Sequence, residues 1–185
     1  MFGVGYVDTR SNVLKTDNRS AVARAADQNN IKIDTWGADY VHVLYTETHG
    51  TFDVLGWGVV QTGSWGNMRQ RAGAFVGEAG WQPLANLWKP WISAGYSYGS
   101  GDSDPNDAQH GTFFRLLTTP RQYARFPFYN MMNNADAYAT LNLRPVSRLA
   151  GRSEVHGVGC VNSVRRGSPQ KPGPSDTLWQ FYRGS

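Results

Sequence analysis

Arginine is the residue type in this chain whose chemistry is most useful for binding a partner. Lysine and arginine together number 18 against 14 aspartates and glutamates, which gives a formal net charge of +4. The lysines are Lys15, Lys32, Lys89 and Lys171, and the remaining basic residues are arginines. A guanidinium forms forked hydrogen bonds with carboxylates and phosphates. The arginines are scattered and no nucleic-acid-binding motif accompanies them, so we expect an acidic polymer as partner and no nucleic acid.

Several cations stand at alternate positions of apolar segments. Leu141 and Leu143 alternate with Arg144, and Arg152 and His156 share the polar positions of residues 149–158. Because successive side chains of a strand point to opposite faces, such cations would line one wall. The candidate residues of a cationic path are Arg71, Lys89, Arg115, Arg121, Arg125, Arg144, Arg152 and His156. Acidic neighbours that would keep a bound polymer mobile are Glu78, Asp136 and Glu154. For each candidate arginine, the alternative role is a structural one, in a network of paired arginines and carboxylates.

One short segment resembles the start of a calcium-binding loop. Asp102, Asp104 and Asn106 stand at every second position, as oxygen ligands do in such loops. The sixth position is Asp107 instead of glycine, and no glutamate closes the loop, so the sequence favours a solvated turn. The single cysteine, Cys160, excludes an intrachain disulfide and a cysteine-based metal site. We expect no cofactor.

The histidines do not indicate a catalytic site. His42, His49, His110 and His156 are far apart in sequence, and no local Ser/His/Asp motif surrounds them. His110 with a carboxylate of the preceding loop is the one suggestive pair, and packing or a loop hydrogen bond explains it equally well. We therefore predict no catalytic residue and no enzymatic activity.

The elements that must position the cations are strands. In residues 88–102, Ile92, Ala94, Tyr96 and Tyr98 alternate with small or polar residues. A segment of this length fits a strand that crosses a membrane at a tilt, which needs about 9–11 residues. The mean hydropathy is -0.49 and no apolar run reaches the length of a membrane-spanning helix. Both features are compatible with a β-barrel, in which half of each strand is polar.

The whole chain predicts an all-β, antiparallel, up-and-down transmembrane β-barrel, present as a partial barrel of about 7–8 strands. The expected strands are residues 2–10, 31–46, 51–65, 70–81, 88–102, 136–145 and 149–158, in a single domain 1–185 with a long insert at 103–134. A helical turn at 21–26 is possible within an exposed loop, and the insert could enter the lumen. Most tryptophans near strand ends suggest interfacial girdles. The alternative is a β-sandwich with aromatic residues in its core.

Residues 110–145 contain several unusual short sequence motifs, one after another. The run HGTFFRLLTTPRQYARFPFYNMMNNADAYATLNLRP, preceded by GDSDPND at 101–107 and followed by RSEVH at 152–156, resembles the alginate export family of bacterial outer-membrane proteins. The resemblance is dense over residues 95–157, and the chain departs from it after Gly159. It implies a monomeric barrel in contact with outer-membrane lipid, which exports an anionic, alginate-like polysaccharide.

The function expected from this resemblance is porin-like export through an arginine-lined lumen. A soluble carbohydrate-binding β-sandwich and a non-functional barrel fragment are the alternatives. No signal peptide precedes the first expected strand, and a last strand begins at residues 178–182, which suggests a reading frame truncated at both ends. We expect location in the bacterial outer membrane and no conductance from this chain alone.

Overall fold

The computed structural model describes residues 1–10, 15–84, 87–104, 106–116, 131–146 and 148–162. Eight strands and one short helix occupy this part of the chain. Their bounds are β1 Phe2–Asp8, α1 Ala21–Ala26, β2 Ile31–Thr46, β3 Gly50–Trp65, β4 Met68–Gln82, β5 Trp91–Gly99, β6 Gln109–His110, β7 Asn134–Val146 and β8 Leu149–Cys160. Among the described residues, no helix has the length and apolar character of a membrane span.

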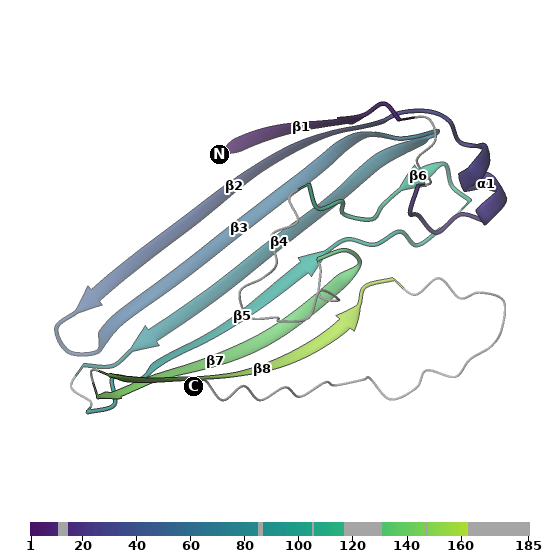
Figure 1. The fold of residues 1–185 in the computed structure, drawn as a ribbon. Coiled ribbons are helices and arrows are strands. Elements are labelled where there is room, and N and C mark those ends of the chain that lie inside the picture. The colour runs from purple at the N-terminus through teal and green to yellow at the C-terminus, as the bar shows by residue number, and fades with distance from the viewer. Residues whose placement is uncertain (11–14, 85–86, 105, 117–130, 147, 163–185) are drawn as a thin grey trace.

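The strands form one sheet in the order β1-β2-β3-β4-β5-β7-β8, and each pairs antiparallel with its neighbours on this path. The short β6 lies off the path and pairs parallel with β4 through Arg69 and Gln70. Figure 1 shows the long strands β2, β3 and β4 side by side, with β1 and β8 at the two edges. The all-β, up-and-down architecture of a partial barrel is thus confirmed.

The two faces of the sheet differ in chemistry. The polar face carries Glu78 and Asp136, and the apolar face carries Phe75, Ile92 and Leu141, because residues opposite one another in an antiparallel pair share a face. Ile92 remains 46% exposed and Leu141 37% exposed. A sandwich would bury these side chains between two sheets. The β-sandwich interpretation is therefore wrong, since no second sheet covers the apolar face in the described part of the chain.

Strand boundaries agree with the sequence to within a few residues, but β5 begins at Trp91 instead of Trp88. The prediction of tryptophan girdles is only partly correct. Trp36 and Trp81 lie on the apolar face, whereas Trp65 lies on the polar face opposite Ile31. Trp65 is buried because loop residues pack over it, in contact with a core cluster at that end of the sheet.

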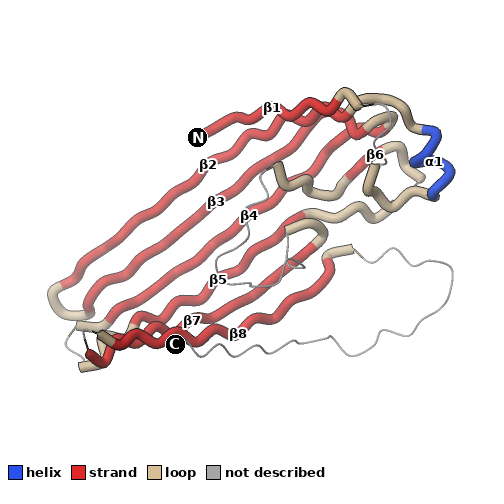
Figure 2. The backbone as a smooth tube through the Cα atoms, viewed as in Figure 1, coloured by secondary structure: helices blue, strands red, loops and turns tan. Residues whose placement is uncertain are grey.

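The two ends of the polar face are filled differently. We call the end that contains residues 15–30, 65–70, 100–104 and 106–114 the packed end. The end that contains residues 47–49, 82–84, 87–91, 142–146 and 148–152 is the open end. Figure 2 shows loops and the helix α1 gathered at the packed end. In both hydrophobic clusters, buried strand residues pack against loop residues of the packed end: Ile33 belongs to the cluster that contacts Phe114, and Val59 to the cluster that includes Phe113. The open end is the place where several predicted cations meet.

Candidate functional site

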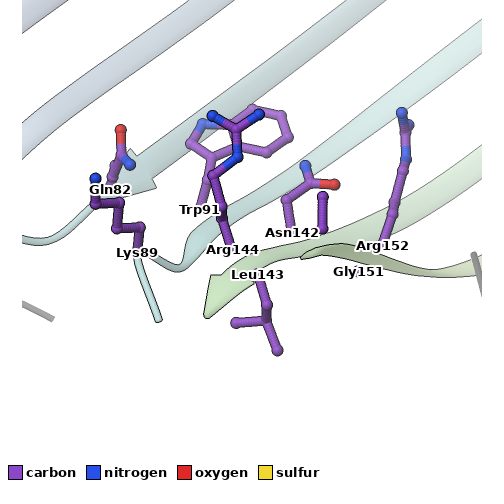
Figure 3. Close-up of a pocket in the computed structure, with 9 residues that line it drawn as sticks. Gln82, Lys89, Trp91, Asn142, Leu143, Arg144, Gly151 and Arg152 are labelled. Carbon is purple, nitrogen blue, oxygen red and sulfur yellow. The ribbon is translucent and has the colours of Figure 1, made fainter. Parts of the chain in front are cut away.

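A cavity of about 370 Å³ opens on the polar face at the open end. Its lining includes three cations, Lys89, Arg144 and Arg152. Figure 3 shows Arg144 and Arg152 on the same side of the sheet as Asn142, while Leu143 points away from them. The described residues that line the cavity are Gln82, Lys89, Trp91, Asn142, Leu143, Arg144, Ala150, Gly151 and Arg152.

Strand pairing explains why these side chains converge. Trp91 of β5 lies opposite Asn142 of β7, which lies opposite Arg152 of β8, so three neighbouring strands contribute one row of the polar face. The indole Nε1 of Trp91 donates to Asp53 Oδ1 at 2.7 Å, which fixes the ring on the wall. The backbone N–H of Arg144 donates to the Trp88 carbonyl at 2.8 Å and ties β7 to the loop before β5. The row is therefore held by backbone and side-chain hydrogen bonds.

The cations of the cavity remain accessible. Arg144 and Lys89 are exposed, and the side chain of Arg152 keeps 50% of its accessible area. Arg152 forms an ion pair with Glu154, whose side chain is 7% exposed. A guanidinium that is paired on one side and hydrated on the other can still bind a second carboxylate. This end of the polar face can attract anions without burying them.

Farther along the polar face, acidic side chains form a hydrogen-bonded network. The hydroxyl of Tyr138 donates to Glu78 Oε2 at 2.7 Å, and Thr140 Oγ1 donates to Glu154 Oε1 at 3.3 Å. His156 Nδ1 lies 3.1 Å from Asp136 Oδ2, and the Asp136 side chain is fully buried. His156 is therefore on the predicted face, where a carboxylate engages its ring.

The packed end holds a cluster of buried ion pairs. Arg19 lies 2.8 Å from Asp17 and 3.0 Å from Asp27, and Lys15 lies 3.5 Å from Asp27. The four side chains are at most 10% exposed. Burial alone would raise the pKa of Asp17, but hydrogen bonds from Arg19 and Trp65 outweigh it and lower that pKa.

Asp27 joins the loop at residues 15–30 to the sheet, and the same competition between burial and hydrogen bonding sets its pKa. Burial would raise its pKa, yet the hydrogen bonds from the backbone of Asn67 at 3.0 Å and from Arg19 lower it. Gly66 permits this approach, because its φ is +62° and a Cβ at this position would lie 2.1 Å from Asp27 Oδ2. These charges are used to pack the loop, which leaves them unable to bind a solute.

His110 is buried in the same region. Its ring stacks on Trp65 with centroids 4.5 Å apart, and its Nδ1 lies 2.6 Å from Gln70 Oε1. Burial lowers the pKa of His110 to about 4. His110 is thus a neutral packing residue of the wall at ordinary pH.

Near His110, burial and the charge of Asp107 raise the pKa of Asp102.

The described part of the insert lies against the polar face. Gln61 donates to the Phe114 carbonyl at 2.7 Å and accepts the Phe114 N–H at 2.9 Å. Phe113 is buried against Val59 and Ala74. Residues 113 and 114 of the insert therefore lie on the polar face at the packed end.

The structure separates the predicted path residues into groups. Lys89, Arg144 and Arg152 come together at the cavity, and Arg115 follows Phe114 at the packed end. Arg71 lies opposite Thr62, on the same face as Phe75, so its side chain starts from the apolar face. Strand parity is the reason, because Arg71 is one residue from Gln70 of the polar face. Arg121 and Arg125 lie outside the described residues.

The candidate calcium segment forms a hydrogen-bonded turn. Asp104 Oδ1 accepts the backbone N–H of Asn106 at 2.9 Å, and Asp102 is buried. Within the described ranges, no group of three or more His, Cys, Asp or Glu residues is placed to hold a metal ion.

Sequence reasoning missed the neutral residues of the cavity. Asn142 shares strand parity with Arg144, so alternation alone could have placed it there. Gln82 and Trp91 line the cavity because of the register between β4, β5 and β7, and the sequence contains no direct signal for that register.

Comparison with known proteins adds one match. The family model for alginate export matches residues 8–157 of the chain. This range begins at the last residue of β1 and ends within β8, so it contains the cavity and the packed end. No curated protein and no solved structure matches the chain.

Proposed function

Since the chain belongs to the alginate export family, we propose that its polar face lines part of a conduit that passes an anionic polysaccharide across the bacterial outer membrane. The family match supports outer-membrane polysaccharide export in general. The finer statement, that cations of the open end contact the polymer, is our proposal.

The observation that carries this proposal is the convergence of three cations on one cavity. Lys89 comes from a loop, Arg144 from β7 and Arg152 from β8, and all three line the same space. A wall of one charge sign raises the local concentration of the opposite ion. A polymer with a carboxylate on each sugar would be attracted to this end of the wall.

The acidic network beside the cavity suits transport better than tight binding. Glu154 pairs with Arg152, and Asp136 and Glu78 continue the acidic side of the wall. Conduction requires attraction that is strong enough for entry and weak enough for release. Mixed charge along the path lets an anionic polymer move from one cation to the next.

A conduit also needs a closed wall. In the described sheet, β1 and β8 are edge strands, and unpaired backbone groups at an edge are not tolerated in lipid. The proposal therefore requires further strands to pair with both edges. We expect the completed barrel to act as a monomer and to guide its substrate without chemical conversion.

Binding of oligouronates tests the proposal. The full chain in detergent is titrated with uronate oligomers and with neutral oligosaccharides of the same length. The triple variant Lys89→Gln/Arg144→Gln/Arg152→Gln should weaken uronate binding by at least about tenfold, since charge-assisted hydrogen bonds contribute about 1.5–3 kcal/mol each. Binding of the neutral oligomer should not change.

The matched control is Arg71→Gln, which removes a cation from the apolar face. It should bind uronate as the parent chain does. Equal uronate binding by the triple variant and the parent would contradict the proposal. A chain that stays folded and monomeric in buffer without detergent would contradict the membrane setting.

A further inference from the structure

We propose that Lys32, Arg69 and Arg71 form a binding site for the phosphate groups of anionic lipid headgroups. This inference rests on the proposed membrane setting of the sheet, and it concerns the face opposite the cavity. The three residues lie on β2 and β4, at the end of the apolar face next to the packed end. We call them the basic patch.

Register brings the basic patch together. Lys32 lies opposite Ser64, and Ser64 lies opposite Arg69, so Lys32 and Arg69 belong to one row across β2, β3 and β4, with Ser64 between them. Lys32 and Arg69 are two strand spacings apart, about 10 Å, and Arg71 is about 7 Å farther along β4. Long basic side chains can span this area and converge on one headgroup.

The chemistry of the apolar face changes abruptly at this point. Along β4, Arg69 and Arg71 are followed on the same face by Gly73, Phe75 and, at the far end, Trp81. The step from Gly73 to Trp81 spans about 27 Å along the strand, which corresponds to about 20 Å across a membrane at the usual tilt. This approaches the apolar band of about 25 Å that barrels present to lipid. The basic patch therefore lies at headgroup depth.

A tryptophan marks the same boundary. Trp36 and Val60 form the row next to the patch, and they are 62% and 58% exposed. Tryptophan is enriched where a barrel wall meets the headgroups. Lys32, Arg69 and Arg71 are exposed beyond this row, and no ion pair or hydrogen bond engages their side chains within the described part of the chain. Three hydrated cations beside an apolar wall fit anionic lipid.

The basic patch is confined to one end. On the described strands, no other lysine or arginine lies on the apolar face. The opposite end of that face carries Phe52, Trp81 and Leu141. Asp34 lies opposite Thr62, which lies opposite Arg71, and it reduces the charge of the patch. A net positive patch at a single end predicts contact with one leaflet.

The test compares two triple variants with equal charge change. The full chain is transferred to mixed micelles with equal amounts of phosphatidylglycerol and phosphatidylcholine, and the retained lipids are counted by native mass spectrometry. The parent should retain phosphatidylglycerol in preference. The variant Lys32→Gln/Arg69→Gln/Arg71→Gln should reduce that preference by roughly tenfold or more. The cavity variant Lys89→Gln/Arg144→Gln/Arg152→Gln should leave it within about twofold, since those cations lie on the other face.

The same two variants separate this inference from the proposed function. The basic-patch variant should bind uronate oligomers normally, and the cavity variant should not. An unchanged lipid preference in the basic-patch variant, or an equal loss in both variants, would overturn the lipid site. If the triple variant does not fold, Arg71→Gln alone should still lower the preference by a few-fold, and an unchanged value there would overturn the site as well.

Discussion

The packed end and the open end use charged residues on the same polar face in opposite ways. At the packed end, the side chains of Lys15, Asp17, Arg19 and Asp27 are almost completely removed from water and bonded to one another. At the open end, Arg144 is exposed and Arg152 is half exposed. The comparison separates charges that hold a loop in place from charges that can receive a solute.

The difference between the two ends shows that a cation's position in a barrel wall is not enough to make it a transport residue. Desolvation of a charge costs several kcal/mol, which only several well-placed partners can offset. Arg19 has such partners in two carboxylates. Arg144 has a hydrated environment and no need of compensation. Exposure and partners, more than residue type, decide which cations can bind a passing polymer.

Removing one buried carboxylate should show the largest effect. Asp27→Ala leaves Arg19 and Lys15 without this acceptor, so we expect a loss of about 3–5 kcal/mol in the free energy of unfolding. Urea titration of the chain in lipid vesicles measures it. The control Asp104→Ala removes an exposed turn carboxylate and should cost about 1 kcal/mol or less. Similar small losses in both variants would erase the distinction between the two ends.

Acidification should loosen the packed end before the open end. The pKa of His110 is about 4 in the folded chain, against an ordinary value of 6.5 for histidine, so the unfolded chain binds more protons between these values. Stability is therefore complete above pH 6.5 and declines as the pH falls toward 4, by at most about 3 kcal/mol. Hydrogen exchange of residues 109–114 at pH 7 and pH 5 measures this decline.

Two histidine variants isolate the source of this pH dependence. His110→Gln should remove the decline, whereas His42→Gln, which alters an exposed residue of the apolar face, should retain it. The raised pKa of Asp102 produces a slope of the opposite sign near the acid end of the range. Persistence of the full decline in His110→Gln would assign it to another group.

Crowding at a turn should produce an intermediate effect. Gly66→Ala forces a side chain into a position with φ +62° and 2.1 Å from Asp27 Oδ2, so we expect a loss of about 1–3 kcal/mol. Gly56→Ala is the matched control, since a Cβ there meets nothing within 4 Å. Thermal unfolding of both variants compares them. Equal stability would show that the loop at residues 15–30 does not hold the packed end together.

Loss of a cavity cation should affect stability least. Arg152→Gln removes a half-exposed ion pair, so the free energy of unfolding should change by less than about 1 kcal/mol. Uronate binding should still fall by a few-fold. Calorimetric titration combined with urea unfolding checks both values, and a large stability loss with normal binding would make Arg152 a structural residue like Arg19.

Alternation predicts the strands and their two faces, because half-buried strands have a period of two that the sequence displays directly. It places Arg144, Arg152 and His156 correctly on one face. The same rule removes Arg71 from the path, since Arg71 and Phe75 have equal parity. The prediction for Arg71 rests on charge without the strand position, and the register corrects it.

Residues in loops escape such reasoning. Lys89 reaches the cavity from a loop position with φ 42°, and the loop itself has no periodic pattern. Trp65 is expected at a membrane interface but is buried by residues from the insert, which are far away in sequence. Contacts of this kind depend on which loop folds over which face.

The sequence by itself determined a single antiparallel sheet with one apolar and one polar face, because backbone geometry converts alternating residue types into faces without reference to distant contacts. Only the tertiary structure decided which charges are buried and which are open to a solute. Long-range packing of the loop at residues 15–30 and of residues 110–114 against β2, β3 and β4 removes water from one end of the polar face. That desolvation is the physical reason for the division between the packed end and the open end.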